Sequence, residues 1–318
     1  MWFNNALIYQ YELDDSTDLA DLLSQDAMKP CPPHARFIYG WLPAIAGEFV
    51  HEAAGAAVIC MGKEERLLPR GVINRILNER VQALEAQRGY AIKRAEKGQM
   101  AEDLEFELLP KSFCLQKRTL ALLDTVSKRL IINASSANQA SQLTSLLRKS
   151  VPGMSIEPLQ HMGNLSVLFA EWITNPASLP ANFQLASDCL LFSLDDDKKR
   201  FNCKGYELPA EEILTLLSQG LAAAEISIIW NERIQFTLTH ELTFKRLKCL
   251  DYLVDDFNEI RQLDEEYEQQ DASLILLSGE FRSLMDDLLA GITATAPTSD
   301  ADISIPVAQE KVEESCPF

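Results

Sequence analysis

Short apolar runs typical of strands and amphipathic segments typical of helices follow one another in this chain without a regular strand–helix–strand alternation. Regular alternation would predict a parallel sheet, because parallel strands need long crossover connections that are usually helices. Its absence favours the α+β class, with mixed sheets and helices. At 318 residues the chain is long enough for about two or three structural units.

The expected helices are marked by apolar residues at helical spacing and by residues that favour helix ends. In the clearest case, apolar residues recur from Val72 to Leu84, with Pro69 near the first turn and Gly89 as the stop. A second, polar helical stretch continues to about Glu107. Further helices are expected at residues 16–28 (with Ser16 as a cap), 136–149, 209–217 and 283–292.

The expected strands are short runs of apolar, β-branched and aromatic residues. They lie at residues 6–9, 37–39, 56–60, 120–124, 130–132, 189–194, 201–207, 226–230, 233–239 and 242–250. The runs at 189–194 and 201–207 flank a charged turn, which predicts a hairpin. Residues 293–318 are rich in Thr, Ala, Pro, Asp and Glu, so we expect a disordered tail there.

The net charge of the chain is −18, which by itself disfavours DNA as a partner because phosphates repel an acidic protein. The charge is unevenly distributed, however. Residues 60–149 contain 16 basic and 10 acidic side chains, whereas residues 150–318 contain 11 basic and 29 acidic ones. A positive segment in an acidic chain is a hint of a polyanion site, and a solvated helix face would produce the same pattern.

The motifs of common catalytic and metal sites are absent from the sequence. Gly55 and Gly62 are too far apart for a phosphate-binding loop, and Glu64 stands where the loop needs a hydroxyl. The four histidines stand alone, and no cysteine pair has zinc-ligand spacing. Seven scattered cysteines favour free thiols in a reducing cytosol. We therefore expect no enzyme activity, no cofactor and no bound metal.

The chain also lacks the marks of a membrane or secreted protein. Its first residues have no basic and apolar signal regions, and no apolar run approaches the roughly 18–20 residues that span a bilayer. We expect a cytoplasmic protein with no membrane partner.

Three clusters of basic side chains could contact phosphates. The first combines Lys93, Arg94 and Lys97 with Lys111, Lys117 and Arg118 around Phe113, the second combines residues 198–200 with Lys204, and the third contains Lys245, Arg246 and Lys248. Lysine and arginine neutralise phosphates and release counterions without reading the bases. Each cluster taken singly is more typical of ordinary surface, so composition alone leaves DNA binding a minority hypothesis.

A series of short motifs from residue 1 to about residue 292 resembles the RdgC family of recombination-associated proteins. No motif is a chemical signature by itself, but their order and spacing make the resemblance specific. The motifs are Met1-Trp2-Phe3, Gly40-Trp41-Leu42-Pro43, residues 63–69, 108–113, 124–126 and 145–150, Glu171-Trp172, residues 232–236, Leu247-Lys248 and Ser278-Gly279-Glu280.

The resemblance implies a ring-shaped homodimer with a positive central opening through which double-stranded DNA passes. It also implies a protein of the nucleoid and the replication fork that limits access of the RecA recombinase by occupying DNA. Basic side chains would line the opening while the acidic excess faces outward. The expected units are a central α+β domain (1–70 and 122–187), a projecting helical tip (71–121), a base α+β domain (188–292) and the tail (293–318).

The resemblance also assigns roles to individual residues. Phe113 falls on an aromatic position where two copies meet, and a buried core phenylalanine is the alternative. The expected DNA-contacting residues are Lys93, Arg94, Lys97, Lys111, Lys117, Arg118, Lys204, Lys245, Arg246 and Lys248. The family's basic-glutamine pair is replaced here by Gly205-Tyr206, and lysines are missing around residues 222–225. We expect a less positive opening on that side.

Two rival functions remain open. A protein-interaction scaffold could act directly on a recombinase without contacting DNA. A metal-dependent nuclease could use the carboxylates at residues 195–197 and 264–266 to hold magnesium. A charged turn and a solvated helix face are the more ordinary interpretation of these two acidic runs.

Overall fold

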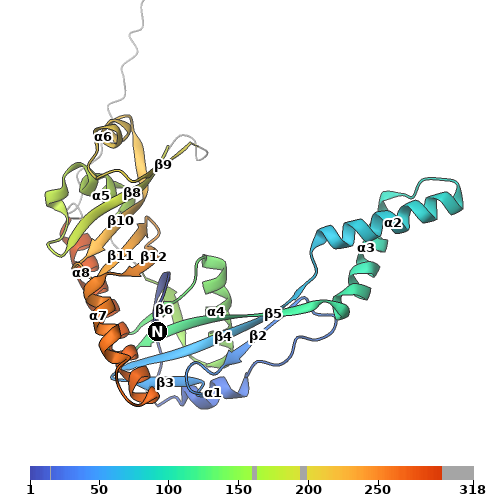
Figure 1. The fold of residues 1–318 in the computed structure, drawn as a ribbon, viewed down its shortest axis with the longest axis horizontal. Helices are drawn as coiled ribbons and strands as arrows, with labels where there is room; N and C mark the ends of the chain where they lie inside the picture. The colour runs from blue at the N-terminus through green and yellow to red at the C-terminus, as the bar shows by residue number, and fades with distance from the viewer. Residues whose placement is uncertain (15, 160–162, 194–198, 296–318) are drawn as a thin grey trace, which may run out of the picture.

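The computed structural model describes residues 1–14, 16–159, 163–193 and 199–295, in which twelve strands form one sheet with helices on both faces (Figure 1). The helices are α1 (Leu19–Gln25), α2 (Arg70–Arg88), α3 (Arg94–Leu108), α4 (Ala137–Ser150), α5 (Leu165–Thr174), α6 (Glu211–Ser218), α7 (Asp251–Ile260) and α8 (Glu266–Thr295), with 3-10 turns η1 (Leu109–Lys111) and η2 (Pro176–Ser178). None of the described helices is both long and apolar enough to cross a bilayer.

The sheet is antiparallel at every pair of neighbouring strands. The order is β2-β4-β5-β6-β1-β12-β11-β10-β8-β9, with β3 on β4 and β7 on β1. In chain order the strands are β1 (Ala6–Glu12), β2 (Phe37–Leu42), β3 (Val50–Ala53), β4 (Ala56–Leu67), β5 (Phe113–Asp124), β6 (Arg129–Ile132), β7 (Ser155–Pro158), β8 (Phe183–Ser193), β9 (Arg200–Lys204), β10 (Leu221–Trp230), β11 (Ile234–Thr239) and β12 (Thr243–Cys249).

The α+β class is confirmed, but the expectation of several mixed sheets is wrong. Strand β1 joins what would otherwise be two sheets, because Ala6 pairs with Phe244 of β12 on one side and Leu7 pairs with Ile132 of β6 on the other. A pairing between the first and the last strand of the chain order therefore makes the sheet continuous.

Two apolar cores lie on the two faces of this sheet. In β4, Ala56 and Val58 face the core that includes α5, α6 and α8, whereas Ala57 and Ile59 face the core beneath α1 and α4. Successive strand residues point to opposite faces, so a run that is apolar at every position is what a strand covered on both sides requires. Figure 1 shows α8 along one side of the sheet and α4 along the other.

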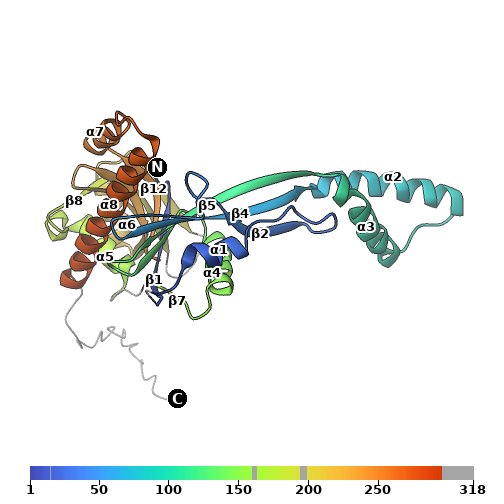
Figure 2. The same cartoon turned by 90° about the horizontal axis from the view of Figure 1, so that it is seen from below.

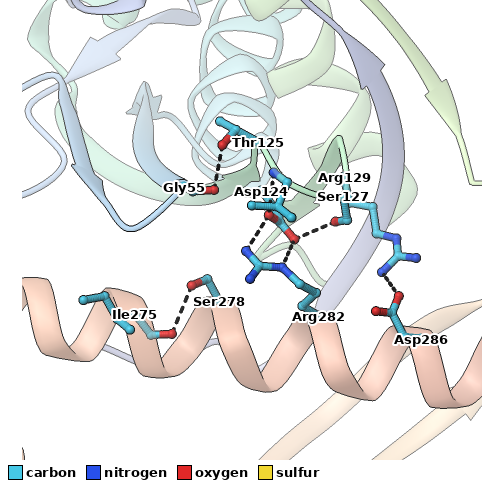
Figure 3. Close-up of polar contacts among 10 residues, drawn as sticks. Gly55, Asp124, Thr125, Ser127, Arg129, Ile275, Ser278, Arg282 and Asp286 are labelled. Carbon is cyan, nitrogen blue, oxygen red and sulfur yellow. Dashed lines mark hydrogen bonds and ion pairs between the residues drawn. The ribbon is translucent and has the colours of Figure 1, made fainter.

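Helix α8 is fixed to the sheet by charged contacts as well as by its apolar face (Figure 3). The guanidinium of Arg282 donates two hydrogen bonds to the carboxylate of Asp124, at 2.7 and 2.9 Å. Arg129 pairs with Asp286 at 2.7 Å, one turn further along the helix. Burial would raise the pKa of Asp124, but the hydrogen bonds from Arg282, Ser127 and the Val126 amide outweigh it and lower the pKa.

Strands β4 and β5 form a long ribbon that carries α2 and α3 away from the body of the molecule (Figure 2). Pairing runs from Ala56 with Asp124 to Leu67 with Phe113. The side chain of Arg66 donates to the carbonyls of Cys31, Pro32, Leu109, Pro110 and Ser112, which ties the outer end of the ribbon to the loop before β2 and to η1.

Local end signals predicted several elements correctly. Helix α2 spans Arg70–Arg88, and Gly89 ends it with a left-handed φ of 77° that glycine adopts without a steric penalty. Ser136 caps α4 through its side chain, and the strands at 189–194 and 201–207 do pair as a hairpin. Of the expected charged turn at 195–200, only residues 199 and 200 are described, and Arg200 begins β9. Residues 293–295 of the expected disordered tail are the last turn of α8, and the rest of the tail lies outside the described residues.

Other boundaries were wrong. Helix α1 is shorter than expected and is capped by Asp18, while Ser16 hydrogen bonds to Asp14 instead. Strands β4 and β5 are longer than expected because each extends along the ribbon, and β9 ends at Lys204. Helix α8 begins at Glu266 rather than at 283, and α5 and α7 were not predicted.

Candidate nucleic-acid interface

Four predicted cations lie on one face of the sheet, opposite the face that packs on α8. We call Lys204, Lys245, Arg246 and Lys248 the sheet cations. Three of them (Lys204, Lys245 and Arg246) line a hollow of about 480 Å³, whose wall also includes Asn202 and Thr237. The structure therefore brings together residues from the second and third sequence clusters.

A bulge in β12 explains why two consecutive cations point into this hollow. Thr237 pairs with Lys245 and Gln235 with Lys248, so β12 has one more residue than β11 in this interval. Phe244 and Leu247 both remain buried in the core, and the two residues between them face outward. Arg246 has a φ of 55°, and its amide donates to the side chain of Asn5 at 3.2 Å.

Glu225 reduces the positive charge of the hollow. Its carboxylate lies 2.8 Å from the ammonium of Lys245 and 3.9 Å from the guanidinium of Arg246. Glu225 belongs to the segment 222–225, which lacks the lysines of the resembling family and where we therefore expected less positive charge. Lys204 and Lys248 are exposed and complete the set on β9 and β12.

A second hollow of about 440 Å³ adjoins the first and shares Lys245 and Glu225 with it. Arg200 and His240 contribute to its wall, together with Ser135, Ser136 and Ala137 at the start of α4. Arg200 belongs to the second basic cluster of the sequence but was not in the final set of expected contacts, and the other residues were not considered as contacts. Ser136 was expected only as the first residue of a helix, and backbone amides at a helix start also favour anions.

The remaining predicted cations lie on the ribbon and its helices, and we call them the arm cations. Lys93 and Arg94 are exposed at the start of α3. Lys97 lies 3.3 Å from Glu85 and Lys111 lies 3.3 Å from Glu107, so each already has a carboxylate partner. The arm is therefore less positive than its number of basic residues suggests.

Lys117 and Arg118 cannot face the same ligand surface, because they are consecutive residues of β5 and point to opposite faces. Lys117 lies 3.6 Å from Glu65, whose pKa is lowered chiefly by a hydrogen bond from Lys63. The guanidinium of Arg118 donates to the carbonyls of Pro43 and Ala44 at 2.6 and 3.3 Å. Arg118 thus already has a role in holding the loop after β2.

Phe113 is 85% exposed at the outer end of β5, so it is not part of the chain's own core. Its pairing partner Leu67 is 45% exposed, and Leu115 and Phe37 lie on the same face of the ribbon at 42% and 49%. We call these four residues the apolar end of the ribbon. Contact between this surface and a second copy stays a prediction.

In the described parts of the chain, no group of three or more His, Cys, Asp or Glu side chains is arranged to hold a metal ion. Residues 195–197 lie outside those parts. In the other acidic run, Asp264 and Glu265 are exposed ahead of α8, and Glu266 is its first residue.

Comparison with known proteins extends over almost the whole chain. The family described as "Putative exonuclease, RdgC" matches residues 1–294. The chain is 31% identical over 298 residues to the recombination-associated protein RdgC of Pseudoalteromonas translucida, with 92% of this chain and 98% of the relative covered.

Two further relatives carry the same name. The protein from Psychromonas ingrahamii is 32% identical, with 91% of this chain and 97% of the relative covered. The protein from Salmonella typhimurium is 29% identical, with 93% and 99% covered. The fold thus defines an α+β protein with a helical arm, and the matches identify its family. The chain belongs to the RdgC family of recombination-associated proteins.

Proposed function

We propose that this protein binds double-stranded DNA without sequence preference, as a ring-shaped homodimer that encloses the duplex. By occupying DNA in the nucleoid it would limit access of the RecA recombinase and so modulate homologous recombination. The main observation in favour of this proposal is that the four sheet cations share one face of the sheet, whereas α7 and α8 lie on the other.

The chemistry of the sheet cations supports this type of binding. Their side chains suit phosphate oxygens, and three of them converge on one hollow, where the carboxylates of Asp188 and Glu225 offset part of their charge. The exposed end of the ribbon supports self-association, because Phe113 and its neighbours present apolar surface that a second copy could cover. Cations from two copies would then face one duplex.

Threading on DNA is tested by comparing linear duplex with covalently closed circular duplex of the same sequence and length. A closed ring should slide off free ends during a chase with competitor DNA, and it should persist on the circle. Blocking both ends of the linear duplex with bulky protein adducts should restore persistence. Equal loss from circular and unblocked linear DNA would contradict enclosure, and equal affinity at low and high salt would contradict phosphate binding.

A nuclease is the second candidate, because the family description contains the words "Putative exonuclease". Hydrolysis would require magnesium and should be abolished by Asp264→Ala if the acidic run before α8 holds the metal. Incubating end-labelled duplex with the protein and magnesium provides the test. Release of nucleotides that persists in Asp264→Ala would rule out this acidic run as the metal site.

A further inference from the structure

Cys189 of β8 and Cys203 of β9 face each other across neighbouring antiparallel strands. We propose that these two residues form a redox-active dithiol, which a peroxide converts into a cross-strand disulfide. The proposal concerns covalent modification of the chain and does not depend on DNA binding.

The backbone geometry places the two thiols within reach of each other. Residues directly opposite in an antiparallel pair have Cα atoms about 4.5 to 5.5 Å apart, and disulfides tolerate about 4.4 to 6.8 Å. Their Cβ atoms are normally about 4.5 to 5.5 Å apart, whereas a disulfide needs about 3.5 to 4.5 Å. Closing the bond therefore requires a movement of about 1 Å or less in many such pairs.

The position of β9 makes that movement feasible. In the described sheet β9 is the terminal strand and pairs with β8 alone, so it can shift without breaking a second set of ladder hydrogen bonds. On its other side β8 is held by β10, where Ile226 pairs with Cys189. A bond formed with some strain is also more easily reduced, which suits a reversible modification.

Cys31 lies outside the strands, and the other three described cysteines each pair with a different type of residue. Cys60 pairs with Leu120, Cys114 with Arg66, and Cys249 with Ile234. The exposed thiol of Cys114 provides an internal control for general oxidation. The opposed arrangement of two sulfur atoms thus distinguishes Cys189 and Cys203 from accessible but isolated thiols.

The surroundings of the two thiols assign them different roles. Cys189 is 4% exposed, and burial together with the adjacent Cys203 raises the pKa of its thiol to about 12. It therefore stays protonated and reacts slowly with a peroxide, since the thiolate is the nucleophile. Both thiols are buried, and Cys203, which is 9% exposed on the terminal strand, is the more accessible of the two.

The reaction balances with hydrogen peroxide as the oxidant. The Cys203 thiolate attacks one peroxide oxygen, the O–O bond breaks, and Cys203 becomes a sulfenic acid while hydroxide leaves and takes up a proton. The Cys189 sulfur then attacks the Cys203 sulfur, the S–O bond breaks, and water leaves with the thiol proton. Two thiols lose two electrons and two protons, and one peroxide becomes two waters.

The test treats the folded, full-length protein with hydrogen peroxide, blocks remaining thiols by alkylation and maps tryptic peptides by mass spectrometry. The expected product joins the peptide of residues 150–198 to that of residues 201–204, at a mass two hydrogens below the sum of the reduced peptides. Treatment with dithiothreitol before alkylation should return both peptides as alkylated thiols. Circular dichroism before and after oxidation checks that the fold persists.

Two variants sharpen the result. Cys203→Ser should abolish the linked peptide, whereas Cys114→Ser should leave its yield unchanged. The proposal would be overturned if Cys189 and Cys203 were alkylated to the same extent with and without peroxide, under conditions that fully oxidise Cys114. Independent oxidation of each thiol to a sulfinic acid without the linked peptide would also overturn it. Because the wild-type product is measured directly, the conclusion does not depend on either variant being folded.

Discussion

Removing one sheet cation should change the salt dependence of DNA binding, and the size of the change should show whether one or two copies of the chain contact the duplex. Lys204→Ala is the suitable change, because Lys204 is exposed, lines the first hollow and ends the terminal strand β9. A surface substitution of this kind alters folding stability by no more than about 0.5 kcal/mol. A change in DNA binding would then reflect the lost charge.

The magnitude follows from counterion release. Each Lys–phosphate contact contributes about −0.9 to the slope of log affinity against log salt concentration on duplex DNA. If two copies face the duplex symmetrically, one substitution removes two contacts, and the slope should become shallower by about 1.8. A single engaged chain would give about 0.9. Between about 50 and 200 mM salt, the dimer value corresponds to a roughly tenfold smaller loss of affinity.

Fluorescence anisotropy with a labelled duplex, measured at four or more salt concentrations, gives the slope for each variant. Lys149→Ala is the matched control, because Lys149 is 73% exposed at the end of α4 and lies outside both hollows. The control should keep the wild-type slope. An unchanged slope for Lys204→Ala, or an equal change in the control, would refute the assignment of Lys204 to the phosphate-binding surface.

Three further predictions concern assembly, stability and the pH dependence of stability. Phe113→Ser should shift the proposed dimer toward monomer in sedimentation velocity, with Tyr90→Ser (63% exposed) as the control; an intact dimer would contradict the role of Phe113. Arg282→Met should lower the free energy of unfolding, measured in urea, by about 2 to 4 kcal/mol, because it leaves the buried carboxylate of Asp124 without its bidentate partner. A loss below about 1 kcal/mol would contradict the importance of the Arg282–Asp124 pair. Because the pKa of Asp124 is lowered in the folded state, the contribution of its carboxylate to folding stability is complete above the ordinary aspartate pKa of about 3.9 and is lost as pH falls through the folded-state pKa. Over that pH interval Asp124→Asn should therefore lose less stability than the wild-type protein.

Local sequence signals predicted the elements that depend on a few neighbouring residues. Gly89 ends α2 and Ser136 caps α4, and each effect is confined to one turn of backbone. The helical spacing of Leu274, Leu277 and Phe281 shows that part of the early half of α8 could also have been predicted. The acidic residues before Ser283 obscured that signal.

Long-range pairing could not be predicted in the same way. Nothing near Ala6 indicates that it pairs with Phe244, yet this contact makes the sheet continuous. The bulge at Arg246 likewise depends on the register between β11 and β12. Sequence reasoning therefore found the basic residues but could not say which of them share a surface.

Much of the acidic excess of this chain lies away from the sheet cations, which reconciles a net charge of −18 with the proposed phosphate-binding surface. Residues 251–271 contain nine acidic side chains and one basic one, and they form α7 and the start of α8. The sheet cations lie across the sheet from α8. Salt screens charges beyond about 8 to 10 Å near physiological ionic strength, so the potential at a phosphate in the hollow would depend mainly on the charges that line it, which are three cations and the carboxylates of Asp188 and Glu225. The net charge of the whole chain is therefore a poor guide to the sign of the ligand at this face.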